Sequence, residues 1–145
     1  MTREKILFLD DERAWCGPYL ENLNDLFEVA VFHEVQLALD YFEHFQDVEA
    51  LIVDVMMPPP PDTPATETNK GLETGIWFAE KMRRYVVAHR SPIVFLTNRD
   101  QENFADRLTQ MALPEQLYEV RLKLNTSPTA LPVIVKQMIN AAKRR

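Results

Sequence analysis

Glycine and cysteine are scarce in this sequence, and each scarcity excludes a class of site. The 145 residues contain three glycines, Gly17, Gly71 and Gly75, which are too few and too scattered for the glycine-rich loops that cradle nucleotide phosphates. The single cysteine, Cys16, excludes a disulfide framework and any metal site built from several cysteines. We therefore expect a reduced thiol and a cytoplasmic protein.

Long apolar runs and excess positive charge are lacking as well. No apolar stretch approaches the roughly 18 residues that a membrane-spanning helix needs. The first run, Ile6–Leu9, is too short for a signal peptide, and acidic residues follow it at once. The chain has 22 acidic side chains against 16 Lys and Arg, a formal net charge of −6, which disfavours nonspecific binding to nucleic acid or to a membrane. We expect neither kind of partner.

The apolar residues that are present gather in short runs. Hydrophobic residues make up 46% of the chain and charged residues 26%, which is typical of a soluble globular protein with about one domain. Short runs without strict alternation are typical of strands buried on both faces of a parallel sheet. Four clear runs and a weaker fifth occur, at Ile6–Leu9, Val29–Phe32, Leu51–Val53, Ile93–Leu96 and Leu117–Leu122.

Helical periodicity separates these runs. Apolar residues recur every three or four positions and predict amphipathic helices over about 35–45, 78–86, 104–111 and 131–142. Another helix should fall between Glu12 and Leu26, and we expect it to begin late because Gly17-Pro18 would interrupt it. The regular alternation of strand and helix predicts a doubly wound α/β fold, with five parallel strands and helices on both faces of the sheet.

A proline-rich segment lies after the third predicted strand. Four consecutive prolines, Pro58 to Pro61, stiffen its start, and polar residues follow. A loop between a strand and the next helix usually takes about 2–6 residues, so we interpret residues 58–74 as an insertion into a single domain of residues 1–145. Two readings stay open, a solvated mobile segment or a segment that acts as a lid or binds a partner.

Carboxylates follow two of the predicted strands at the point where each strand ends. Asp10, Asp11 and Glu12 come directly after the first strand, and Asp54 follows the third. Because the carboxyl ends of parallel strands meet at the same edge of a sheet, we expect these side chains to converge. Clustered carboxylates repel one another unless a cation lies among them, and oxygen ligands suit Mg²⁺. A carboxylate can also act as a nucleophile and form an aspartyl-phosphate.

The fourth and fifth strands add a hydroxyl and a cation to the same edge. Thr97 ends the fourth strand, and Arg121 and Lys123 lie near the end of the fifth. A hydroxyl, an ammonium group and Mg²⁺ together could neutralise the oxygens of a bound phosphoryl group. Each residue alone would be an ordinary cap or a solvated charge, so the prediction depends on their joint placement.

Three segments of the chain resemble the receiver domain of bacterial two-component response regulators. Residues 5–12, KILFLDDE, resemble the first strand and acidic pair of that family. Residues 51–58, LIVDVMMP, resemble the strand with its phosphoacceptor, and residues 91–97, SPIVFLT, resemble its fourth strand. The resemblance covers nearly the whole chain and implies a flavodoxin-like fold of the receiver type.

The resemblance also implies roles for individual residues. Asp54 would accept a phosphoryl group from a histidine kinase, a phosphotransfer protein or a small phosphodonor. Thr97 would donate a hydrogen bond to a phosphoryl oxygen, and Lys123 would pair with the phosphate. The groups implied to hold or support Mg²⁺ are Asp10, Asp11, Asp54 and the backbone carbonyl of Met56. Such a domain is not an enzyme beyond its own phosphotransfer and dephosphorylation, and it signals through contacts with a downstream protein.

The sequence departs from the family pattern in and after the fifth strand. The family's lysine normally precedes a proline in a cis peptide, whereas Leu124 follows Lys123 here, so we expect a trans bond and a changed loop. With Lys123 as the cation, the family's aromatic switch position is Val120, which has no ring to rotate. Tyr118 lies two residues earlier on the same strand face and could substitute for it. If Arg121 is the cation instead of Lys123, the spacing from Tyr118 to Arg121 matches the family's spacing from the aromatic switch residue to the cation.

Two alternative functions follow from these departures. The first is a pseudo-receiver, a protein-binding module that keeps the fold and works without phosphorylation, which the insertion, Val120 and Leu124 favour. The second is a phosphatase of the haloacid-dehalogenase type. That family requires Asp two residues after its nucleophile, and Glu12 and Met56 occupy the corresponding positions here.

Overall fold

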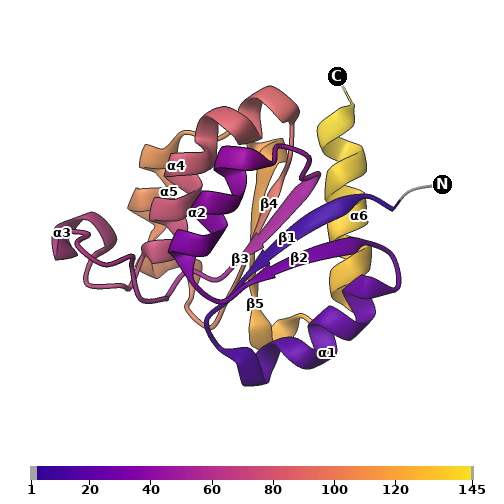
Figure 1. The fold of residues 1–145 in the computed structure, drawn as a ribbon, viewed down its shortest axis with the longest axis horizontal. Coiled ribbons are helices and arrows are strands. Elements are labelled where there is room, and N and C mark those ends of the chain that lie inside the picture. The colour runs from indigo at the N-terminus through magenta and orange to yellow at the C-terminus, as the bar shows by residue number, and fades with distance from the viewer. Residues whose placement is uncertain (1–2, 145) are drawn as a thin grey trace.

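The computed structural model, which describes residues 3–144, has five parallel strands in one sheet (Figure 1). The strand order is β2-β1-β3-β4-β5, the doubly wound order of flavodoxin-like folds. The strands are β1 (Lys5–Leu9), β2 (Glu28–Phe32), β3 (Ala50–Val53), β4 (Ile93–Thr97) and β5 (Tyr118–Leu122). The five predicted strands and their parallel arrangement are confirmed.

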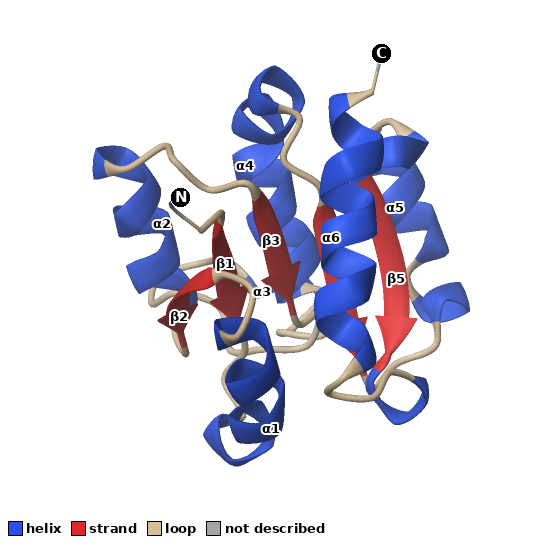
Figure 2. Ribbon diagram, turned by 90° about the vertical axis from the view of Figure 1, so that its right-hand side faces the viewer, coloured by secondary structure: helices blue, strands red, loops and turns tan. Residues whose placement is uncertain are grey.

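Helices form a layer on each face of the sheet (Figures 1 and 2). The α-helices are α1 (Arg13–Asn24), α2 (Val35–His44), α3 (Ala65–Thr68), α4 (Thr74–His89), α5 (Ala105–Met111) and α6 (Ala130–Lys143). Short 3₁₀ turns add η1 (Gln101–Asn103), η2 (Glu115–Leu117) and η3 (Lys123–Asn125). Within residues 3–144, none of the helices is long and apolar enough to cross a membrane.

Side chains that alternate along the strands divide the core between the two layers. Ile6 and Phe8 of β1 face α1 and α6, whereas Leu7 and Leu9 face α2 and α4. The three central strands are almost wholly buried, and this explains their continuous apolar runs. The edge strand β5 is half-buried along its length, so its sequence mixes charged with apolar residues.

Helix α1 begins earlier than its sequence predicts. It starts at Arg13 and continues through Pro18, so the expected late start is wrong. Pro18 removes one backbone hydrogen bond, the bond that would reach the Ala14 carbonyl. The helix nevertheless buries Tyr19 and Leu23 against the sheet and α6, and this tertiary packing outweighs the local preference.

The proline-rich insertion packs against the domain. Pro60, Thr68 and Gly71 are buried, and α3 lies within the segment. The ends of the segment meet, because the Met57 amide donates a hydrogen bond of 3.1 Å to the Gly71 carbonyl. Gly71 has φ of 87° at this closure, a backbone conformation that glycine adopts at little cost. Most of the segment is nevertheless exposed, and both readings of its role stay predictions.

Arg107 of α5 links the insertion to α4 and α5 through hydrogen bonds. Its guanidinium donates to both carboxylate oxygens of Glu80 in α4 at 2.7 and 3.0 Å, and to Glu73, the residue before α4, at 3.3 Å. A further hydrogen bond of 2.7 Å reaches the Glu67 carbonyl in α3. Two carboxylates and a carbonyl around one planar cation use the fork of donors that arginine offers and lysine does not.

We expect Arg107→Ala to lower the free energy of unfolding by about 1–3 kcal/mol, since the Glu73 and Glu80 carboxylates would lose a shared partner. Urea unfolding measures this loss, and limited proteolysis should show faster cleavage within residues 58–72. The matched control is Arg84→Ala on the exposed face of α4, which should leave both measurements unchanged. Equal stability of the two variants would contradict the role of Arg107.

Candidate functional site

Three carboxylates meet where β1 and β3 end. Leu9 pairs with Val53 in the parallel register, so Asp10 and Asp54 leave the sheet side by side. The Asp54 amide donates a hydrogen bond of 3.0 Å to the Leu9 carbonyl, which fixes Asp54 beside the end of β1. Asp10, Asp11 and Asp54 each offer an oxygen within 4.8 Å of the others. The structure thus brings together Asp10, Asp11 and Asp54 as predicted, whereas Glu12 is exposed and lies outside this group.

Protein donors occupy both carboxylate oxygens of Asp10. Its Oδ1 accepts a hydrogen bond of 2.9 Å from the Glu12 amide, and its Oδ2 lies 2.8 Å from the Lys123 ammonium. His33 holds the same turn, because its Nδ1 donates to the Asp10 carbonyl at 2.8 Å. Asp11 differs, since its Oδ1 is buried without a hydrogen-bond partner. An orphaned carboxylate oxygen beside two other carboxylates suits a hard cation such as Mg²⁺.

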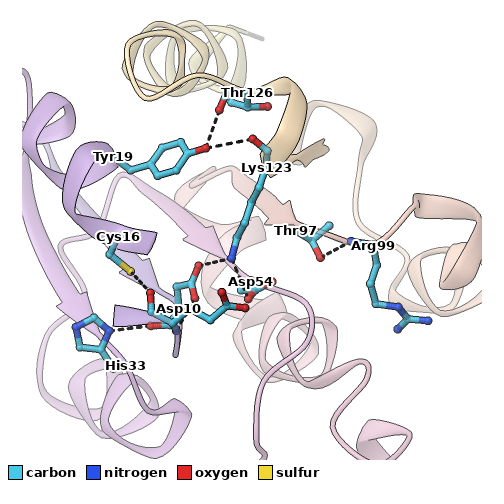
Figure 3. A network of polar contacts seen from close by, with 10 residues as sticks. Asp10, Cys16, Tyr19, His33, Asp54, Thr97, Arg99, Lys123 and Thr126 are labelled. Atoms are coloured by element: carbon cyan, nitrogen blue, oxygen red, sulfur yellow. Dashed lines mark hydrogen bonds and ion pairs between the residues drawn. The ribbon is translucent and has the colours of Figure 1, made fainter. Parts of the chain in front are cut away.

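Lys123 reaches the carboxylates from the far edge of the sheet (Figure 3). Its Nζ lies 2.8 Å from Asp10 and 3.3 Å from Asp54, and its side chain is 1% exposed. Arg121, the competing cation, pairs instead with Glu119 at 2.5 Å and is half-exposed. The geometry therefore places Lys123, not Arg121, beside Asp54. One ammonium does not neutralise three carboxylates, so the site keeps negative charge that would attract a divalent cation.

Burial and crowding change the proton affinity of these groups. Burial, together with the neighbouring charge of Asp10, raises the pKa of Asp54 to about 7, although Lys123 opposes the shift. The same two causes raise the pKa of Asp11. Burial acts to lower the pKa of Lys123, but the hydrogen bond to Asp10 and the charge of Asp54 raise it overall. A cation at this site would relieve the repulsion that raises the carboxylate values.

Thr97 and Met56 flank Asp54. Thr97 ends β4, which lies on the opposite side of β3 from β1. The hydroxyl oxygen accepts a 3.3 Å hydrogen bond from the Arg99 amide (Figure 3). The Met56 side chain lies exposed two residues beyond Asp54. Ligation by the Met56 carbonyl stays a prediction.

The two proposed switch residues lie at different levels of the sheet. Val120 pairs with Phe95 and Tyr118 with Ile93, whereas Thr97 pairs with Leu122. Tyr118 is therefore four residues, roughly 13 Å, from the level of Thr97. Both side chains are half-buried and pack against the core on the α2, α4 and α5 side. This register does not favour Tyr118 as a substitute, and both switch roles stay predictions.

Gly75 lets α4 approach the Asp54 backbone closely. A Cβ atom at this position would overlap the Asp54 carbonyl oxygen and lie 2.8 Å from the Val55 Cα. The Gly75 amide also donates a 2.8 Å hydrogen bond to the Val55 carbonyl. This contact with the segment after β3 emerges from the structure alone.

Sequence reasoning missed two aromatic residues of α1. The Tyr19 hydroxyl donates to the carbonyls of Thr126 at 2.7 Å and Lys123 at 3.2 Å. The Lys123 Nζ lies 5.4 Å from the centre of the Trp15 ring. The available signal was the spacing of the pair, four residues apart and directly after the acidic cluster.

The predicted trans bond is confirmed, since no peptide bond between residues 3 and 144, Lys123–Leu124 included, is cis.

Comparison with known proteins supports the architecture. No protein-family model matches the sequence, and no curated protein sequence matches it. Among solved structures, a response regulator receiver protein from Sinorhizobium medicae superposes with a TM-score of 0.74 at 19% identity, over 97% of this chain and 98% of that one. The chain has the fold of a response regulator receiver domain.

Further structures share the receiver fold. A CheY-like receiver domain from Methanospirillum hungatei matches with a TM-score of 0.69 at 15% identity, over 98% of both chains. A BeF3-activated DrrB receiver domain matches with a TM-score of 0.68 at 17% identity, over 96% of this chain and 99% of that chain. These identities are low, so the shared property is the arrangement of the sheet and its helices.

We expect Gly75→Ala to destabilise the receiver fold by about 1–3 kcal/mol or more, because the added methyl group must displace the Asp54 backbone. Gly17→Ala is the matched control, since a Cβ there meets nothing within 4 Å and alanine favours a helix interior by up to about 1 kcal/mol. Thermal unfolding of both variants tests the difference. A Gly75→Ala protein as stable as Gly17→Ala would contradict the close approach.

We expect Asp54→Asn to stabilise the metal-free protein at pH 8 but not at pH 4. The native pKa of about 7 exceeds the unfolded value of about 4, so the native state binds more protons between these values. The free energy of unfolding of the wild type therefore falls as pH rises through this window. The variant lacks this loss and should be more stable than the wild type at pH 8, by up to about 4 kcal/mol.

Urea unfolding of both proteins at several pH values measures this gain. Asp62→Asn, an exposed position in the insertion, is the control and should follow the wild-type curve. A stability difference between Asp54→Asn and wild type that is equal at pH 4 and pH 8 would show that Asp54 has an ordinary pKa.

Proposed function

We propose that this chain is a phosphoryl-accepting receiver domain with Asp54 as the acceptor. The observation that carries the proposal is the group of Asp10, Asp11, Asp54 and Lys123 at the carboxyl end of the sheet, with one oxygen of Asp11 left without a partner. Carboxylates, an ammonium and a hydroxyl at this edge match the needs of a phosphoryl group and its cation. The same proposal takes residues 1–145 as one domain that signals through protein contacts.

The site geometry suggests how Asp54 would react. Lys123 holds the Oδ2 atom of Asp54, which leaves Oδ1 to attack the phosphorus. The new bond joins Oδ1 to phosphorus, and the bond from phosphorus to the donor's leaving group breaks, with its electron pair leaving on that group. A phosphohistidine of a kinase or phosphotransfer protein, or a small acyl phosphate, would serve as donor.

Other residues would stabilise the transferred group. The Lys123 ammonium would shift from Asp54 toward a phosphoryl oxygen, and the Thr97 hydroxyl would donate to another. Asp11, with Asp54, would hold the metal, and Asp10 would support the arrangement through Lys123 and the Glu12 amide. Bound Mg²⁺ would supply positive charge against the phosphoryl oxygens.

A pseudo-receiver is the second candidate, and one observation favours it. Asp54 is only 4% exposed, so a phosphodonor has little direct access to the acceptor. A module that keeps the fold and binds a protein partner without phosphate would need no such access. The two functions differ in whether the carboxylates bind Mg²⁺ and whether Asp54 can be modified.

Acetyl phosphate with Mg²⁺ provides the test. We expect intact-mass spectrometry to show an adduct of about 80 Da, the mass of one phosphoryl group, and Asp54→Asn to abolish it. Chelation of Mg²⁺ and Lys123→Ala should each suppress the adduct, whereas Asp62→Asn should retain it. Because one of the related structures is BeF3-activated, beryllium fluoride is a second probe of the same acceptor.

Two results together would contradict the proposal. The wild type would remain unmodified by acetyl phosphate and beryllium fluoride, and a calorimetric titration would show no Mg²⁺ binding at millimolar concentration. That pair of results would favour the pseudo-receiver.

A further inference from the structure

The Lys123 ammonium has an aromatic neighbour as well as two carboxylates. Its Nζ lies 5.4 Å from the centre of the Trp15 ring, within range of a cation–π interaction. Trp15 in turn stacks on Tyr19, with ring centres 6.1 Å apart and planes 15° from parallel. The two rings are four residues apart in α1, so they share one face of the helix.

Tyr19 fixes the turn that carries Lys123. Its hydroxyl lies within hydrogen-bond distance of the carbonyls of Lys123 and Thr126, at 3.2 and 2.7 Å, and the residue is buried. One hydroxyl therefore spans both ends of η3. Leu124, the residue after Lys123, is 84% exposed and adds little packing to the turn.

The aromatic pair also borders an open pocket beside this turn. The pocket has a volume of about 630 Å³ and lies between α1 and residues 123–128, with Trp15 and Tyr19 in its lining. An indole face attracts an ammonium without adding a charge or accepting a proton. A further carboxylate at this position would instead increase the repulsion around Asp54.

We propose that Trp15 and Tyr19 are positioning residues that hold the Lys123 ammonium between Asp10 and Asp54. Tyr19 sets the backbone from which the lysine side chain extends, and Trp15 lies against its charged end. The inference rests on the proposed function only in the consequence for phosphotransfer. The placement of the ammonium can be measured without any phosphodonor.

The first measurement is the exchange of the Lys123 ammonium protons with water, followed by nitrogen-15 NMR. In the wild type these protons are hydrogen-bonded and shielded from solvent, so exchange is slow. Trp15→Leu and Tyr19→Phe should each accelerate it about tenfold, a free-energy change of about 1.4 kcal/mol, because the first removes the ring beside the ammonium and the second removes the hydroxyl that holds the turn. Trp15→Phe retains a ring and should stay close to the wild type.

Matched variants separate positioning from general loss of stability. Tyr85 also makes two hydroxyl contacts, both of 2.8 Å and both to the Val48 backbone, so Tyr85→Phe loses a comparable pair away from the site. Trp77 lies 5.2 Å from the Lys81 ammonium on α4, and Trp77→Phe serves as the tryptophan control. Both controls should leave Lys123 exchange within about twofold of wild type, a free-energy change of about 0.4 kcal/mol.

The second measurement is the initial rate of phosphorylation by acetyl phosphate with Mg²⁺. Trp15→Leu and Tyr19→Phe should be about five- to tenfold slower than wild type, and Trp15→Phe should recover most of the rate. Unchanged ammonium exchange in both α1 variants overturns the inference. If the wild type is phosphorylated, accelerated exchange with an unchanged phosphorylation rate also overturns it.

The failure of the proposed function is distinct from these outcomes. If the wild type accepts no phosphoryl group but both α1 variants accelerate Lys123 exchange, the positioning role stands and the phosphoacceptor proposal fails. If the wild type is phosphorylated and neither variant changes the exchange or the rate, the phosphoacceptor proposal stands and the positioning role fails.

Discussion

The repulsion among carboxylates at one end of the sheet is the constraint around which the local structure is arranged. Asp10 and Asp54 follow adjacent strands in register, so the fold itself brings their charges together. Burial removes the water that would otherwise screen them. A buried lysine from the edge strand, backbone donors and α1 all lie where they can compensate that charge. The elements that surround this edge are therefore linked through electrostatics as well as through packing.

The sheet fixes the positions of the groups that compensate the charge of the carboxylates. The central strands are buried on both faces, and their apolar side chains fix the level at which each strand ends. Gly75 then brings α4 directly against the Asp54 backbone. The Asp54 backbone consequently has support from β1 and from the start of α4, and its carboxylate has support from Lys123. Such support from several elements limits how far the carboxylate can move without a change elsewhere.

The sequence was sufficient for the strands and for the edge where they end, because both follow from short apolar runs and the topology of parallel sheets. It was insufficient for α1, where the local preference of Pro18 yields to the burial of Tyr19 and Leu23. Arg107 was missed for a related reason, since its partners Glu73 and Glu80 are distant in sequence. The choice between Arg121 and Lys123 likewise needed coordinates, because both lie at plausible spacing near the end of β5.

Because the two ends of the proline-rich segment meet, the length of the segment does not affect the geometry of the strand end beside it. The hydrogen bond between Met57 and Gly71 joins the two ends of the excursion, so residues between them can be added or removed outside the frame of the sheet. The sequence of an insertion closed at its base in this way can vary while the neighbouring strand end stays unchanged. The receiver architecture can thereby acquire a new surface next to Asp54 without rebuilding the fold.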